Sequence, residues 1–245
     1  MKQTRSAQAL FGASAAALFL SMVLTVPNAY PETYIGGQIG TALPAIGGGL
    51  KNIDITSRTS ILGPTHSDLA LDSSITFGAK IGHYFNSARW FGLEAEFFST
   101  TPDIKQQVHT FPNPSAPCAV PCSSTLQGAH FRVMTFAPLN LMFRYNKTRL
   151  QPYVGIGPGI FFARIKGEGP TPGSSTSTSD NGQLGLNAKV GFEYFITRHL
   201  TAFGEWKYNY ARFKFGENTD LFPFPYGFNA TYSMHLVSFG IGYHF

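Results

Sequence analysis

Charged residues are scarce in this chain. Asp, Glu, Lys and Arg together make up 13% of its 245 residues, about half of the ~25% that is usual for a soluble globular domain. The net charge of +5 includes Lys2 and Arg5 at the amino terminus, and no basic run indicates binding to nucleic acid. A soluble surface this poor in charge is difficult to keep in solution, which favours an exterior that faces lipid.

Long apolar runs are lacking beyond the amino terminus. Only residues 9–26 form a run of helix length, so the sequence does not indicate a helical membrane protein. This run follows Lys2 and Arg5 and precedes small residues, which predicts a secretory signal peptide over residues 1–29, cleaved after Ala29. A retained membrane anchor is the alternative. The mature domain is expected to span residues 30–245.

The sequence also lacks the motifs of common catalytic and nucleotide sites. It contains no H-E-x-x-H, no G-x-S-x-G and no P-loop. The glycines of residues 155–159 do not have the G-x-G-x-x-G spacing, and no helix is expected after them. We therefore expect no enzyme activity, no catalytic or metal site and no cofactor.

Cysteine is limited to two residues, Cys118 and Cys122, in a segment rich in Pro and Ser. In an exported protein this spacing predicts a small disulfide within a loop. Free thiols are one alternative. The other is a zinc site completed by His109 and His130, which would require four good ligands to meet in a loop.

Aromatic residues and glycine are abundant, with 23 Phe, 11 Tyr and 26 Gly. In the final stretch, every second residue from His235 to Phe245 is bulky or aromatic, and the residues between them are mostly small or polar. A period of two predicts a strand with one apolar face. The strand could belong to a soluble sandwich, but its aromatic end favours a barrel that faces lipid.

The same alternation recurs earlier in the chain and gives eight predicted strands. Four long and three short connections separate them, which is the asymmetry of an up-and-down membrane barrel. A soluble lipocalin-like barrel would turn its apolar face inward, whereas here the inward candidates are charged. The sequence thus predicts an all-β, eight-stranded antiparallel transmembrane β-barrel. Its strands are expected at about 34–43, 74–85, 90–99, 130–145, 151–165, 183–195, 200–213 and 229–245.

The polar faces of these strands carry both signs of charge. The interior of an eight-stranded barrel is only just wide enough for side chains, and an unpaired buried charge is costly. We therefore expect the charges to pair across neighbouring strands, with Lys80 opposite Glu94 or Glu96. On the stretch 130–145 the pattern places Val133 outside and Arg132 inside. A gated pore and a catalytic carboxylate pair are the alternatives. The predicted lumen charge network is Lys80, Glu94, Glu96, Arg132, Arg144, Lys189, Glu193, Glu205 and Lys207.

The last long connection contains an apolar patch in a position where water is expected. This patch could contact a ligand or a surface, or line a hydrophobic path. Alternatively, it packs over the barrel mouth or joins an aromatic girdle in the outer leaflet. Its residues are Leu221, Phe222, Phe224, Tyr226 and Phe228.

The chain resembles the small OmpA-like outer-membrane barrels, which are often called porin-family proteins or surface antigens. The resemblance covers about residues 34–245 and is carried by the strand alternation, Gln151-Pro-Tyr-Val-Gly155, Glu205-Trp-Lys-Tyr208 and the terminal Phe245. It implies a monomer in the bacterial cell outer membrane, in contact with outer-membrane lipid and lipopolysaccharide. It also implies a signal read by the barrel-assembly machinery, formed by Phe239, Ile241, Tyr243 and Phe245.

The resemblance indicates a non-enzymatic barrel with a structural or surface-interaction role through its extracellular loops. A narrow passive channel for small solutes, apolar ones included, is the first alternative. A lipid-modifying enzyme is the second: Ser233 and His235 share a face of the last strand, but no acid stands at a fixed spacing beside them. The fold alone does not decide between these functions.

Overall fold

The computed structural model describes residues 32–44, 47–56, 61–65, 68–111, 122–126, 129–167, 178–215 and 227–245. All named elements in these ranges are β-strands. Within the same ranges, no helix has the length and apolar character needed to pass through a membrane. The predicted all-β class is confirmed.

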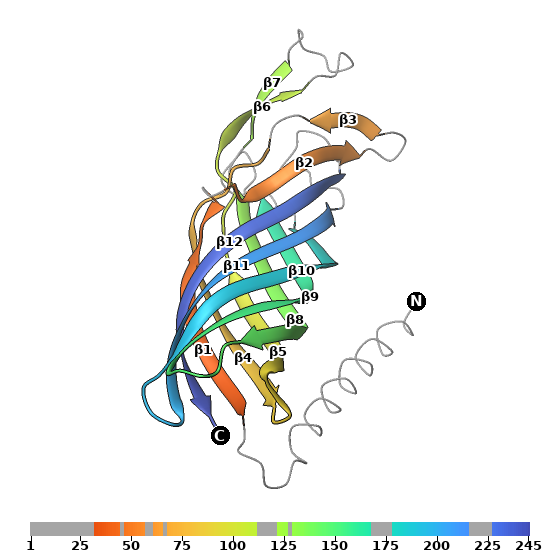
Figure 1. The fold of residues 1–245 in the computed structure, drawn as a ribbon. Coiled ribbons are helices and arrows are strands. Elements are labelled where there is room, and N and C mark those ends of the chain that lie inside the picture. The colour runs from red at the N-terminus through yellow and green to blue at the C-terminus, as the bar shows by residue number, and fades with distance from the viewer. Residues whose placement is uncertain are drawn as a thin grey trace, which may run out of the picture.

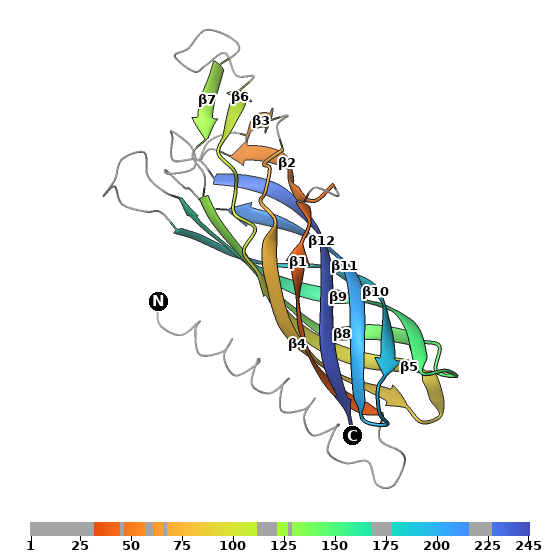
Figure 2. The same cartoon turned by 90° about the vertical axis from the view of Figure 1, so that its left-hand side faces the viewer.

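Eight long strands form a closed antiparallel barrel (Figures 1 and 2). Consecutive strands are neighbours in the ring, and pairing between the first and the last closes it. The predicted eight-stranded barrel is therefore confirmed. Its strands are β1 (Thr33–Ala42), β4 (Ser74–Phe85), β5 (Ala88–Thr100), β8 (Ala129–Arg144), β9 (Leu150–Gly167), β10 (Thr178–Phe195), β11 (Leu200–Phe215) and β12 (Gly227–His244).

The two ends of the barrel differ in their connections. Residues 86–87, 145–149 and 196–199 make short turns at one end, where β1 begins and the chain terminates (Figure 1). We call this the short-turn end and the opposite one the long-loop end. At the long-loop end lie four shorter strands that the sequence analysis did not anticipate: β2 (Gly49–Thr56), β3 (Ile61–Thr65), β6 (Gln107–Phe111) and β7 (Cys122–Leu126).

The strand β2 continues the wall where β1 stops. β12 pairs with β1 from Leu236 to His244, and with β2 from Gly227 to Ser233. The seam that closes the barrel is thus shared by two segments of the chain, separated by residues 43–48. β3 pairs with β2, and β6 pairs with β7 in a separate hairpin.

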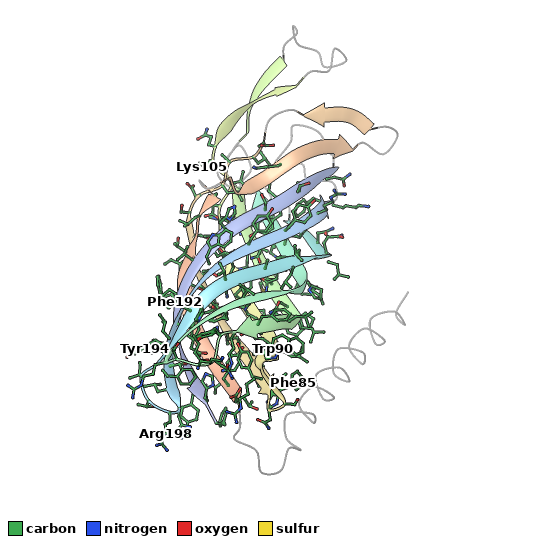
Figure 3. The ribbon with its side chains drawn as sticks, viewed as in Figure 1. Phe85, Trp90, Lys105, Phe192, Tyr194 and Arg198 are labelled. Atoms are coloured by element: carbon green, nitrogen blue, oxygen red, sulfur yellow. The ribbon has the colours of Figure 1, made fainter. Side chains whose placement is uncertain are left out.

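The outer wall of the barrel is mostly apolar, and the interior is polar over the short-turn half. Large apolar side chains cover the outer wall: Ile75 is 67% exposed, Leu184 74% and Ile241 62%. Trp90, Phe192 and Tyr194 lie on the same outer surface nearer the short-turn end (Figure 3). A soluble barrel would have the reverse arrangement, so this exterior fits a lipid environment.

The predicted facing of β8 is wrong in its first half. Arg132 is exposed on the outer wall, and Val133 is fully buried inside. The cause is a bulge at Pro138: between the pairs Glu94–Asn140 and Glu96–Ala137, β8 advances by three residues while β5 advances by two. Proline cannot donate to the strand ladder and favours such a bulge. The extra residue reverses the facing of every residue before it.

The close packing of β1 against β12 predicts that alanine is tolerated at one glycine of this seam but not at another. A Cβ at Gly240 would lie 2.2 Å from the backbone oxygen of Gly37 and 2.3 Å from Phe203, whereas a Cβ at Gly37 would meet nothing within 4 Å. We expect Gly240→Ala to destabilise the barrel by about 1–3 kcal/mol through overpacking. Gly37→Ala should change stability by less than about 0.5 kcal/mol. Denaturant unfolding in lipid vesicles, followed by gel mobility with and without heating, measures both; equal midpoints would contradict this packing.

Candidate functional site in the barrel lumen

The centre of the lumen is occupied by a cluster of six charged side chains, three cations and three anions. All of them are at least 96% buried at the side chain. We call this set the charge cluster; it consists of Lys80, Glu94, Glu96, Lys189, Glu205 and Lys207.

Each cation of the charge cluster touches more than one carboxylate. Lys80 lies 2.5 Å from Glu205 and 3.9 Å from Glu94. Lys189 contacts Glu94 and lies 2.6 Å from Glu96. Lys207 contacts Glu96 and lies 3.0 Å from Glu205. Because every charge has an opposite charge beside it, the cost of burying the six groups is offset.

Neutral side chains complete the hydrogen bonds of the charge cluster. Tyr34 donates from its hydroxyl to Glu94 at 2.6 Å, and Tyr153 donates to Glu205 at 2.7 Å. Gln38 donates to Glu96 at 2.6 Å and accepts from Lys207 at 2.8 Å. The Lys80 ammonium also lies 3.5 Å from the centre of the Phe203 ring, a cation–π contact. These donors and acceptors bind the cluster to the barrel wall.

The charge cluster pairs across the lumen more than the sequence analysis anticipated. Backbone register does place Lys80 opposite Glu96, but the shortest contact of Lys80 is with Glu205 on β11, three strands away around the ring. Lys189 on β10 reaches the carboxylates of β5, again three strands away. The shortest contacts of Lys80 and Lys189 therefore span the interior, while longer ones, such as Lys80–Glu94 at 3.9 Å, join adjacent strands.

Three other residues of the predicted network lie outside this cluster. Arg144 pairs with Glu32, donates to the Arg89 backbone oxygen at 2.9 Å and lies over the Tyr84 ring. Glu193 accepts from Thr201 at 2.7 Å and lies 2.9 Å from a His244 nitrogen. These two groups sit nearer the short-turn end. The third, Arg132, is on the outer wall and takes no part.

Above the charge cluster, toward the long-loop end, the inward side chains become apolar. Phe131, Phe161 and Phe213 are fully buried and surround Tyr232, with ring centres 5.7–6.3 Å from its own. The Tyr232 hydroxyl has no hydrogen-bond partner among the described residues. We call this region the apolar layer; its members are Ala42, Leu50, Leu69, Leu71, Phe98, Ile104, Ala129, Phe131, Val133, Phe161, Ala163, Ile165, Ala211, Phe213, Phe215, Ala230, Tyr232, Met234 and Leu236.

The apolar layer was not predicted as a unit from the sequence. Its wall residues continue the alternation by which polar side chains face inward. Phe161 is an even number of residues from the inward Tyr153, and Phe213 is an even number from the inward Glu205. Extending each alternation to the end of its strand would have found them. Phe131 is different, because it faces inward only through the bulge at Pro138.

The remaining predicted residues are placed as follows. Phe239, Ile241, Tyr243 and Phe245 lie on the outer wall and are 45–62% exposed; their role as an assembly signal stays a prediction. The signal peptide, Cys118 and the apolar patch from Leu221 to Tyr226 fall outside the described residues. Cys122 and Phe228 are described only as positions in β7 and β12, so the disulfide and the patch also remain predictions.

The model of one protein family covers nearly the whole chain. The outer membrane protein β-barrel domain matches residues 9–245. The chain belongs to this family. The barrel is thus one of the bacterial outer membrane, and its long-loop end corresponds to the extracellular end of such proteins.

Three solved outer-membrane proteins are similar to this chain at low sequence identity. OprG from Pseudomonas aeruginosa is 16% identical, with a TM-score of 0.59 over 87% of this chain and 95% of that one. Neisserial surface protein A is 13% identical, with a TM-score of 0.48 over 87% and 97% of the two chains. The attachment invasion locus protein Ail of Yersinia pestis is 14% identical, with a TM-score of 0.43 over 87% and 99% of the two chains. No curated protein matches the chain significantly.

The charge cluster predicts a large penalty for removing one cation. Lys189→Met leaves Glu94 and Glu96 without their shared partner and should destabilise the outer-membrane barrel by about 3–5 kcal/mol. Lys105→Met, which removes an exposed cation 3.1 Å from Asp72, should cost at most about 1 kcal/mol. Denaturant unfolding in lipid vesicles measures the difference.

A double variant separates electrostatics from packing in the same experiment. Lys189→Met/Glu94→Gln restores the balance of charges while keeping side chains of similar size. It should therefore be more stable than Lys189→Met alone. If the double variant were the less stable of the two, the penalty would arise from lost packing and not from the unpaired carboxylates.

Proposed function

We propose that this protein is a non-enzymatic outer-membrane barrel, closed to ions, that acts at its extracellular end. The observation that carries the proposal is the charge cluster. Its ion pairs span the lumen between β4 and β11 and between β5 and β10, with side chains that are buried from water. Charges held this way resist displacement, because separating one pair leaves a buried charge uncompensated.

The surroundings of Ser233 and His235 support the absence of catalysis. Nucleophilic catalysis needs a base within hydrogen-bond reach of the nucleophile, held in turn by a third group. Here Ser233 donates weakly to the Gly47 backbone oxygen at 3.5 Å. His235 stacks on Trp206 and contacts the tilted ring of Tyr208, with ring centres 5.3 and 5.1 Å away, and its Nδ1 has no partner among the described residues.

The first test measures the ion conductance of the barrel. The refolded barrel, placed in a planar lipid bilayer, should show no discrete conductance steps, while an open porin in the same bilayer shows them. Gel mobility before and after heating establishes that the silent sample is folded. Regular single-channel openings from folded wild-type barrel would overturn the closed-barrel proposal and favour a narrow passive channel.

The apolar layer favours a second candidate function, the binding of small apolar molecules that enter from outside. Its interior consists of aromatic and aliphatic side chains, which suit an alkyl or aromatic ligand and exclude ions. The unpartnered hydroxyl of Tyr232 adds a specific feature, since an unsatisfied buried polar group costs about 1–3 kcal/mol. A ligand with a single hydroxyl or carbonyl group would supply the missing partner. The charge cluster would separate that ligand from the short-turn end.

This second candidate is tested with 1-octanol and n-octane as probes in nanodiscs of deuterated lipid. We expect magnetisation transfer from 1-octanol to the ring protons of Phe161 and Tyr232. Tyr232→Phe should weaken binding of the alcohol by about five- to tenfold, the loss of one hydrogen bond, and leave the alkane unchanged. Absence of transfer to either ring, or equal weakening for both probes, would count against it.

A further inference from the structure

Two arginines lie side by side on the outer wall near the long-loop end. Arg132 of β8 and Arg164 of β9 are direct partners in the strand register, and both are exposed. Two residues closer to the short-turn end, the same strands present Met134 and Phe162, which are 37% and 46% exposed. The arginine pair therefore stands at the border between the apolar wall and the polar end of the barrel.

A shallow depression lies between these side chains. It has a volume of about 290 Å³ and is lined by Arg132, Met134, Phe162, Ala163, Arg164, Asn181 and Gly182. The hollow exists because Gly182 of β10, the register partner of Phe162, has no side chain to fill the outer face. Its outward-facing lining is apolar toward the short-turn end and cationic toward the long-loop end.

Among the described residues, the strands β8, β9 and β10 beside the depression carry more cations than acids. Like charges directly opposite each other destabilise a strand pair. Arg164 has Asp180 as its register partner on β10, but Arg132 has no carboxylate partner among the described residues. Lys166 lies two residues farther along β9, opposite His130, and adds a further positive charge. An anion at this position would relieve the repulsion between the two guanidinium groups.

We propose that this depression binds a phosphorylated headgroup of outer-leaflet lipid, the lipid A part of lipopolysaccharide. The phosphate lies between Arg132 and Arg164, and an acyl chain runs along Met134 and Phe162. Guanidinium groups match phosphate oxygens with paired hydrogen bonds. A lipid is favoured over a soluble phosphate because the cations directly adjoin the membrane-facing apolar wall.

The binding is tested on the folded barrel in detergent, by native mass spectrometry with lipid A and with enzymatically dephosphorylated lipid A. Wild type should prefer the phosphorylated form. Arg132→Gln should weaken binding of that form about tenfold or more, which corresponds to losing a hydrogen bond to a charged group. Arg132→Lys keeps the charge without the planar donor pair. Its affinity for the phosphorylated form should lie between those of wild type and Arg132→Gln.

Arg198→Gln is the matched control, because Arg198 is an exposed arginine in the turn at the opposite end of the barrel (Figure 3). It should bind lipid A as wild type does. Equal affinity of wild type for both lipid forms would overturn the proposal, and so would unchanged binding in Arg132→Gln. Complete competition by millimolar inorganic phosphate would show a site for free phosphate and not for a lipid.

Discussion

The structure depends on the requirement that the chain close on itself through β1 and β12. In lipid no water is available to the backbone, so every strand needs a partner on both sides. Closure at eight strands leaves an interior only wide enough for side chains. The polar residues that alternate with the apolar wall must therefore satisfy one another in that narrow space. The charge cluster and its tyrosine and glutamine partners are the result of this constraint.

The interior changes character along the barrel axis, from ion pairs in the middle to aromatic packing toward the long-loop end. Charged pairs fix the middle of the lumen, where Lys80 and Lys189 reach across to distant strands. Aromatic packing occupies the extracellular part, where Phe161 and Tyr232 are fully buried. The first arrangement is directional and resists rearrangement, because each contact needs its partner. The second is non-directional, and side chains packed by dispersion can repack at lower cost.

The sequence allowed the wall to be predicted well, and the interior less so. Alternation with period two correctly oriented Glu94, Glu96 and Lys189, because it follows directly from strand geometry. The alternation could not predict which side chains these residues contact, because contacts across the lumen depend on the tilt and stagger of the closed ring. It failed at Arg132 because the bulge at Pro138 interrupts the alternation. A proline within a strand permits such a bulge but does not locate it, since Pro158 of β9 keeps an unbroken register with β10. The outward arginine was therefore not predictable from the alternation.

The change of partner along β12, from β1 to β2, affects where the chain can accept inserted or deleted residues. β12 holds β1 through nine register pairs, from Tyr34–His244 to Ala42–Leu236, and only then meets β2. A residue added or lost within residues 43–48 changes the link between β1 and β2 but not those nine pairs. The part of the seam nearest the periplasm is thus insulated from insertions that would otherwise shift its register. Evolution can remodel the hairpin of β2 and β3 while the membrane-embedded closure stays the same.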